Sequence, residues 1–141
     1  MLERINPVFN YRVLPLLQKD SQEIADDDRD RILKRCQAAS ERVIIITHGT
    51  DTMLETAEYI AQRPYWTNIS DINLGFQEGK KLVILTGAMK PERFVDSDAM
   101  CNLGLALGAA SLLESGAYIA MSGHVLLWSN CQRNMETGQF I

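Results

Sequence analysis

The chain has 141 residues, of which 46% are hydrophobic and 23% are charged, and this balance is typical of a globular domain. A net charge of −4 without a cluster of Lys and Arg argues against a nucleic-acid partner, because phosphate binding needs a basic surface. The sequence holds no apolar run of about 18 residues and no signal-peptide pattern at its start, so we expect no membrane contact. Three scattered cysteines predict reduced thiols and a cytoplasmic protein: Cys36, Cys101 and Cys131.

Apolar runs of strand length alternate along the chain with longer stretches of helical periodicity. Pro15 in the first run indicates an edge strand or a strand end. The acidic residues 26–28 favour a helix start, because negative charge stabilises a helix N-terminus. In chain order, we expect strands at residues 11–17, 42–47, 82–86 and 117–121, a hairpin strand at 124–128, helices at 29–40, 53–63 and 98–114, a long loop at 64–79 and a polar tail at 130–141.

This alternation predicts the fold class. The run at residues 42–47 (RVIIIT) is β-branched and continuous, which is typical of a strand buried on both faces of a parallel sheet. Strands separated by helices imply βαβ crossovers, so we expect an α/β fold with a mainly parallel sheet in one domain over residues 1–141. Ligands bind such sheets at the carboxyl ends of the strands. The expected places are therefore the turns after Ile46 and Thr86 and the loop near Ser122.

The strongest chemical signal is the turn at residues 47–52 (THGTDT), which joins a strand to a helix. Asp51 can accept a ligand ammonium, and the helix N-terminus offers free N–H groups to a carboxylate. The hydroxyl of Thr50 can act as a nucleophile only if a neighbour takes its proton. Thr50 and Asp51 could thus bind an amino acid or orient a water. The alternative is that Thr50, Asp51 and Thr52 only cap the helix.

Residues 47–57 (THGTDTMLETA) closely resemble the second active-site motif of the bacterial-type asparaginase and glutaminase family. Residues 85–91 (LTGAMKP) resemble the family's next block, residues 20–22 (DSQ) its substrate-binding loop, and residues 117–140 the end of its short-chain, single-domain branch. The resemblance covers nearly the whole chain with the motifs in the expected order. It implies the asparaginase N-terminal domain type, a three-layer, flavodoxin-like, mainly parallel sheet.

The resemblance also implies roles for single residues. Thr50 matches the family's second active-site threonine, and Asp51 matches its partner, which also binds the substrate amino group. The implied substrate-binding positions are Ser21, Gln22, Gly49 and Ala88. No metal is expected, because no cluster of His, Cys, Asp and Glu has the spacing of ligands. No cofactor is expected either, because isolated glycines do not make a dinucleotide-binding fingerprint.

Two features depart from the family pattern. The family's first motif, a strand followed by Thr-Gly-Gly-Thr-Ile, does not occur in the sequence, so we expect the sheet to lack its first strand. That motif carries the threonine generally taken as the nucleophile. Arg133 stands at the family's lysine position and, because arginine stays protonated, it cannot shuttle a proton. We expect Arg133 either to hold Asp51 in place or to be a solvated residue of the tail.

Other residues that invite a catalytic reading have simpler explanations. We expect His48 to shape its turn through a hydrogen bond to the backbone, and His124 to lie at the surface or the core edge. Asp98 precedes a predicted helix, so we expect an N-cap role for it. The aromatic residues at 65, 66 and 128 are expected to pack rather than to hold a cofactor.

The resemblance implies an asparaginase-type amidohydrolase that converts L-asparagine to L-aspartate and ammonia, with L-glutamine as a weaker substrate. The alternative is a non-catalytic or truncated asparaginase-like protein that binds an amino acid or acts as an assembly partner. An unrelated flavodoxin-like binding domain is a third hypothesis, which the order of the motifs disfavours. Short-chain relatives lack a second domain that covers apolar surface, so we expect a homodimer or a higher homo-oligomer.

Overall fold

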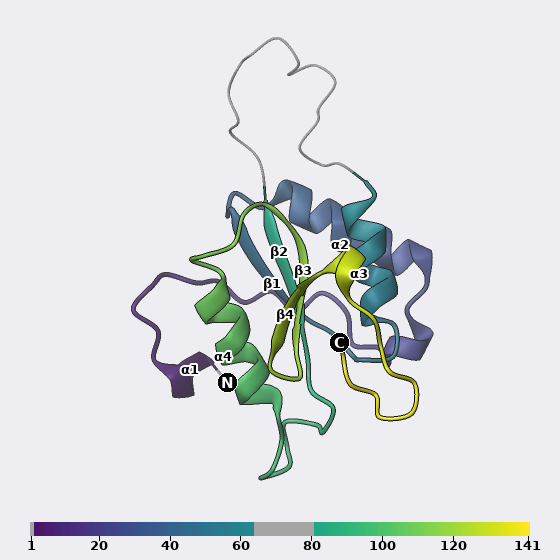
Figure 1. Cartoon of the computed structure of the whole chain (residues 1–141). Coiled ribbons are helices and arrows are strands. Elements are labelled where there is room, and N and C mark those ends of the chain that lie inside the picture. The colour runs from purple at the N-terminus through teal and green to yellow at the C-terminus, as the bar shows by residue number, and fades with distance from the viewer. Residues whose placement is uncertain (1, 64–80) are drawn as a thin grey trace.

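The computed structural model describes residues 2–63 and 81–141, whose main elements are labelled in Figure 1. The sheet is the centre of the fold, and its strands alternate with helices as the sequence predicts. In chain order the elements are α1 (Leu2–Ile5), the short 3₁₀ helix η1 (Ser21–Glu23), α2 (Asp26–Ala38), β1 (Val43–Thr47), α3 (Met53–Ala61), β2 (Leu82–Thr86), α4 (Ala99–Ala109), β3 (Gly116–Met121), β4 (His124–Leu127) and the 3₁₀ helix η3 (Trp128–Asn130).

The four described strands form one sheet in the order β1-β2-β3-β4. The pairs β1–β2 and β2–β3 are parallel, and β3–β4 is antiparallel. Met121 pairs with His124, so the β3–β4 turn has two residues, Ser122 and Gly123, with φ of 54° and 80°. Positive φ at both positions is the geometry of a tight hairpin that matches strand twist. The predicted mainly parallel α/β sheet and its terminal hairpin are confirmed.

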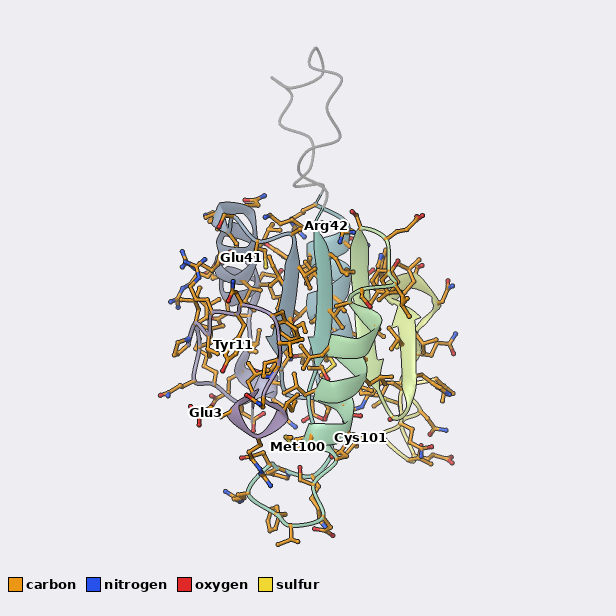
Figure 2. The ribbon with its side chains drawn as sticks, turned by 90° about the vertical axis from the view of Figure 1, so that its left-hand side faces the viewer. Glu3, Tyr11, Glu41, Arg42, Met100 and Cys101 are labelled. Atoms are coloured by element: carbon orange, nitrogen blue, oxygen red, sulfur yellow. The ribbon has the colours of Figure 1, made fainter. Side chains whose placement is uncertain are left out.

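Helices cover both faces of the sheet, which gives three layers (Figure 1). On one face, Val83 and Leu85 of β2 pack in a core with residues of α2 and α3. On the other face, Ile84 packs with Ala106 of α4, and Figure 2 views the molecule from this α4 side. Alternate residues of β2 therefore enter different cores. This explains why the whole strand is buried and why its sequence is uninterrupted by polar residues.

The prediction that β1 is buried on both faces is wrong. Its central residues, Ile44, Ile45 and Ile46, are half-buried, and Val43 and Thr47 are exposed. Among the described strands, β1 pairs only with β2 and forms the edge of the sheet. An edge strand has a neighbour on one side only, so its side chains keep more contact with solvent than those of β2.

The predicted strand at residues 11–17 is also wrong. No helix or strand is formed there, and Tyr11, labelled on this segment in Figure 2, is 47% exposed. Val13 is 66% exposed, whereas Leu16 and Leu17 pack on the core between α2, α3 and the sheet. A strand needs a neighbour that pairs its N–H and C=O groups. Hydrophobicity without such a pairing produces an anchored loop.

The helices agree with the prediction, apart from their ends. Helix α2 begins at Asp26, ahead of the expected start, because Asp28 accepts a hydrogen bond from the backbone N–H of Ala25 at 3.2 Å. Helix α4 ends at Ala109 rather than at residue 114. No helix in the described part of the chain is long and apolar enough to cross a membrane. The expected loop at 64–79, with the aromatic residues 65 and 66, lies outside the described residues.

The tail beyond residue 130 is more ordered than its polar composition predicts. Gln132 and Ile141 exchange two backbone hydrogen bonds, at 2.7 and 2.8 Å, and Arg133 forms a β-bridge with Phe140. Phe140 is 1% exposed and lies in the same core as α2 and α3. The buried ring fixes the folded-back tail onto the body of the protein, and this contact determines where Arg133 lies.

Candidate functional site

The candidate site lies where β1 and β2 end. An open pocket of about 280 Å³ is lined by residues 47–49 after β1, residues 86–88 after β2, Glu92 and the first turns of α4. Two of the three places expected from the parallel sheet thus meet at one edge. Gly49 and Ala88 line this pocket, whereas Ser21, Gln22, Thr50, Asp51 and Arg133 lie outside it. Ser122 is in the β3–β4 turn and does not line the pocket.

Asp51 is held by donors from two distant segments of the chain. Gln22 Nε2 donates to Asp51 Oδ2 at 2.8 Å, and Arg133 Nη1 lies 3.0 Å from Asp51 Oδ1. The hydrogen bond from Gln22, followed by that from Arg133, holds the pKa of Asp51 below its ordinary value of 3.8. The Asp51 side chain is 41% exposed. An ionised and accessible carboxylate therefore stands at the start of α3.

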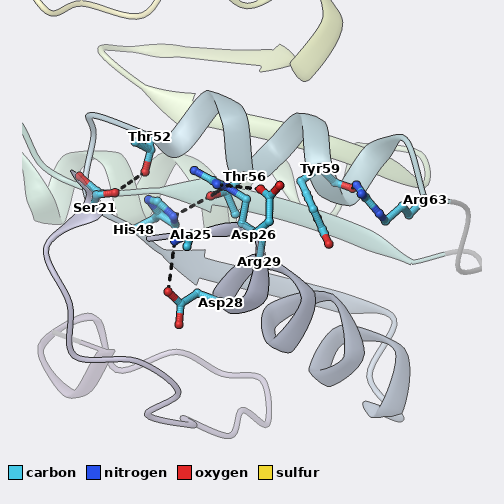
Figure 3. Close-up of polar contacts among 10 residues, drawn as sticks. All are labelled: Ser21, Ala25, Asp26, Asp28, Arg29, His48, Thr52, Thr56, Tyr59 and Arg63. Atoms are coloured by element: carbon cyan, nitrogen blue, oxygen red, sulfur yellow. Dashed lines mark hydrogen bonds and ion pairs between the residues drawn. The ribbon is translucent and has the colours of Figure 1, made fainter. Parts of the chain in front are cut away.

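The loop that carries Gln22 is clamped onto the same turn. Thr52 Oγ1 donates to the Ser21 carbonyl at 2.6 Å, as Figure 3 shows. A Cβ atom placed on Gly49 would lie 2.7 Å from both Cβ and Oγ of Ser21, which no unstrained contact allows. Ser21 is 4% exposed as a result of this packing. Gly49 is therefore needed for the close approach of η1 to the turn after β1.

Arg133 reaches Asp51 because the folded-back tail carries it there. Its side chain is 18% exposed, and the guanidinium lies 5.9 Å from the centroid of the Phe140 ring. Its Nε atom is buried and finds no hydrogen-bond partner among the described residues. The alternative of a solvated tail residue is thus wrong. Arg133 is a fixed, permanently charged neighbour of Asp51 that cannot accept a proton.

The turn after β2 is braced by Asp98 and Asn102. Asp98 accepts hydrogen bonds from the backbone N–H groups of Met89, at 3.1 Å, and Lys90, at 3.0 Å. Asn102 Nδ2 donates to the Gly87 carbonyl at 3.0 Å and to Asp98 at 2.8 Å. Burial acts to raise the pKa of Asp98, but the hydrogen bonds together outweigh it and lower the pKa from its ordinary value of 3.8. Asp98 occupies the N-cap position of α4 but makes no side-chain cap, so the expected capping role is wrong.

His48 joins the turn to the helices behind it. Its Nδ1 atom lies 2.7 Å from the Gly49 carbonyl oxygen, which is the backbone contact expected of it. Its Nε2 atom lies 2.9 Å from Thr56 Oγ1 (Figure 3). Burial lowers the pKa of His48 from its ordinary 6.5. Thr56 also accepts a hydrogen bond from Arg29 Nε at 3.3 Å. The sequence alone does not identify Thr56 or Arg29. The available signal is a polar residue, Thr56, on the buried face of a helix.

The reactive side chains expected at or near the site, Thr50 and the histidines, differ in their surroundings. Thr50 is half-buried, and its hydroxyl makes no side-chain hydrogen bond within the described ranges. In residues 2–63 and 81–141, no group of three His, Cys, Asp or Glu side chains is placed to hold a metal ion. His124 is exposed on β4, as expected. The polar side chains that meet at this turn are those of Asp51, Gln22 and Arg133.

The mainly parallel sheet lies between two layers of helices, and the turn that carries Asp51 lies at the carboxyl ends of its strands. This arrangement is that of the α/β proteins whose ligand site lies at those strand ends. The profile of the family described as "Asparaginase, N-terminal" matches residues 1–139, so the chain belongs to the asparaginase family. The resemblance seen in the sequence is confirmed over almost the full chain.

Individual relatives agree with this assignment. The chain is 26% identical to a glutaminase-asparaginase from Acinetobacter glutaminasificans over 98% of this chain and 40% of that protein. It is 30% identical to a protein from Haemophilus influenzae named "Probable L-asparaginase periplasmic", over 84% of this chain and 32% of the relative. The chain therefore spans less than half of the length of the curated relatives that it matches.

A solved structure shares the fold. The crystal structure of the probable cytoplasmic L-asparaginase from Campylobacter jejuni superposes with a TM-score of 0.72 at 25% sequence identity. The superposition covers 89% of this chain and 38% of that protein. The similarity confirms the predicted α/β fold, with a mostly parallel sheet between helices.

Proposed function

We propose that this chain provides the amino-acid-binding part of an asparaginase-type amidohydrolase site, with L-asparagine as substrate and L-glutamine as a weaker one. The reaction is hydrolysis of the side-chain amide to L-aspartate and ammonia. The observation that carries the proposal is the carboxylate of Asp51, which Gln22 and Arg133 hold from both sides at the start of α3. Family membership and the named activities of the relatives support the same substrate class.

The polar groups match an α-amino acid in charge and in number. The ionised Asp51 would accept the ligand ammonium. Gln22 already donates through Nε2 to Asp51, which leaves its amide oxygen free to accept a second ammonium hydrogen. Ser21 and the unpaired N–H groups of the first turn of α3 suit the α-carboxylate. Ala88, which lines the pocket beside Gly49, would contact the side-chain amide through its backbone.

A second candidate function is binding of the amino acid without hydrolysis, and Arg133 is the observation that favours it. A guanidinium beside Asp51 favours the ionised form of that carboxylate but cannot take part in proton transfer. Thr50 makes no side-chain hydrogen bond to any described residue that would accept its proton. On this hypothesis the chain is a non-catalytic relative or an assembly partner.

Calorimetric titration with L-asparagine and an ammonia-release assay, both on the 141-residue chain, separate the two candidates. Hydrolysis predicts asparagine-dependent ammonia release that is abolished in Thr50→Ala. Binding without hydrolysis predicts a titration signal that Asp51→Asn weakens, with no ammonia release from the unmodified chain. Absence of both a titration signal and ammonia release would reject the proposed site. L-Aspartate and D-asparagine serve as controls for the amide and for the stereochemistry.

We further propose that residues 1–141 form one domain of the asparaginase N-terminal type and that the chain assembles as a homodimer. Two-fold dimers are the commonest assemblies of soluble proteins, and exposed apolar residues such as Val13, which is 66% exposed, offer surface for contact. Light scattering after size exclusion measures this directly, and a monomer would contradict it. One relative is named periplasmic and another cytoplasmic, so the cytoplasmic location stays a prediction.

A further inference from the structure

A chain of hydrogen bonds links helix α2 to the turn after β1. Arg29 Nε on α2 donates to Thr56 Oγ1 on α3 at 3.3 Å. Thr56 Oγ1 lies 2.9 Å from His48 Nε2, and His48 Nδ1 lies 2.7 Å from the Gly49 carbonyl. Figure 3 shows Arg29, Thr56 and His48 converging between the two helices and the sheet. None of these three side chains is needed to complete the group around Asp51.

The direction of each hydrogen bond follows from the chemistry of its partners. A carbonyl oxygen only accepts, so His48 Nδ1 must carry the hydrogen that bonds to Gly49. In a neutral imidazole, Nε2 is then an acceptor, and the Thr56 hydroxyl donates to it. Thr56 retains its lone pairs for the hydrogen from Arg29. The chain therefore runs without conflict from Arg29 through Thr56 and His48 to Gly49.

Burial of Thr56 and His48 favours one tautomer of the His48 ring. Thr56 is 0% exposed and His48 is 8% exposed, so water has little access to either partner. The Arg29 side chain is 11% exposed and also pairs with Asp26, with Nη1 3.0 Å from Oδ1. If one member is removed, a buried polar group of its neighbour loses its partner, and such a loss costs more than the bond itself stabilised. One tautomer of His48 satisfies all of the partners.

We infer that Arg29 and Thr56 are positioning residues, which hold His48 in its Nδ1–H form and thereby fix the Gly49 carbonyl. The peptide of Gly49 precedes Thr50 and Asp51, so its orientation sets the start of the binding turn. The Gly49 site is also where Ser21 packs without room for a Cβ atom. A rotated Gly49 peptide would therefore disturb both segments of the proposed amino-acid site. This inference rests on the proposed function for its ligand and on contacts alone for the tautomer.

The test is nitrogen-15 spectroscopy of the histidine rings in the full chain at neutral pH, without ligand. The chain has two histidines, and His124→Gln assigns the signals of His48. We expect a protonated Nδ1 and an unprotonated Nε2. Thr56→Val keeps the shape of the side chain and removes the hydroxyl, so we expect a population of the Nε2–H tautomer to appear. The backbone amide signals of Thr50 and Asp51 should shift together with it.

Affinity for L-asparagine is the second measurement. We expect Thr56→Val to weaken binding by about threefold to tenfold, the loss that corresponds to one hydrogen bond. Thr56→Ser restores the hydroxyl and should restore both the tautomer and the affinity. Arg29→Met gives an independent variant at a less buried position, in case Thr56→Val does not fold. Its matched control on α2 is Arg31→Met, at an exposed residue, which should change neither signal.

Each outcome decides the inference. An unchanged tautomer in Thr56→Val and Arg29→Met would overturn it, even if binding became weaker, because the residues would then act through packing alone. A changed tautomer with unaltered Thr50 and Asp51 amides would overturn the positioning role. If the unmodified chain binds no asparagine, the proposed function fails, whereas the tautomer and the amide signals still test the hydrogen-bond chain.

Discussion

Arg133 Nη1 lies 3.0 Å from Asp51 Oδ1, so the last segment of the chain contacts the turn after β1. The contact exists because Phe140 is buried and the tail folds back as a bridged loop. It also sets the chemistry, since a guanidinium stabilises a carboxylate but does not exchange protons near neutral pH.

Asp51→Asn should reduce the affinity for L-asparagine by about tenfold to a hundredfold, because a hydrogen bond between charged groups is lost. Calorimetric titration measures the change. The low pKa of Asp51 means that its carboxylate ionises as pH rises through a value below 3.8. Binding should therefore not depend on Asp51 titration at pH values well above 3.8. Asp30→Asn, which breaks only a surface pair with Lys34 on α2, is the matched control and should bind normally.

Arg133→Lys should release ammonia about tenfold faster, or more, than Arg133→Met. A lysine ammonium can exchange a proton, and general acid–base catalysis raises reaction rates by at least about that factor. Binding should be retained in Arg133→Lys, since a positive charge remains beside Asp51. The coupled ammonia assay and calorimetry are run on the same preparations. Equal, measurable release from both variants would show that proton transfer at this position does not limit hydrolysis, whereas release from neither variant would favour binding without hydrolysis.

Gly49→Ala should weaken asparagine binding by about tenfold and destabilise the protein by about 1–3 kcal/mol, because the new Cβ collides with Ser21. The matched control is Gly104→Ala in α4, where a Cβ atom meets nothing within 4 Å. That change should stabilise the protein by about 0.5–1 kcal/mol through helix propensity. Denaturant unfolding compares the two variants, and equal effects would argue against a special role for Gly49.

His48 should make stability depend on pH. Burial, as the largest cause, lowers its pKa below 6.5; Arg29 also lowers the pKa, while the Gly49 hydrogen bond and Glu55 act to raise it. Below pH 6.5 the unfolded chain binds a proton that the folded chain does not, so stability should fall as pH decreases from 6.5 toward the folded pKa. The slope should be at most about 1.4 kcal/mol per pH unit. His48→Gln should remove that part of the slope, whereas His124→Gln, on exposed β4, should keep it.

Ile84→Ala should destabilise the protein by about 2–5 kcal/mol, because Ile84 is 0% exposed in the centre of β2 and its loss leaves a cavity under α4. Leu112→Ala, at a residue that is 85% exposed, should change stability by less than about 0.5 kcal/mol. Unfolding in urea measures both. Similar losses in the two variants would mean that the α4 face of the sheet is not packed as described.

Local patterns determined much of the fold and of the site. The strand at Leu82–Thr86 has the bounds that the sequence predicts. An unbroken apolar run is stable only if both of its faces are buried, and helices bury both faces of this strand. The turn at residues 47–52 was recognised because a motif of adjacent residues is a local property. The approach of Gly49 and Ala88 at one edge followed from the parallel order of the strands.

Contacts between distant segments decided the rest. Residues 11–17 are apolar enough for a strand, but no described strand pairs with them, and hydrogen-bond pairing is not encoded in one segment alone. The sequence predicts a helix cap at Asp98, yet in the folded chain both of its carboxylate oxygens accept hydrogen bonds from the backbone N–H groups of Met89 and Lys90. Arg133 reached Asp51 only through the burial of Phe140. Composition and periodicity thus determined most of the helices and strands, whereas tertiary packing decided which strands pair and which charges meet, because the energy of a polar contact depends on partners that only the folded chain brings together.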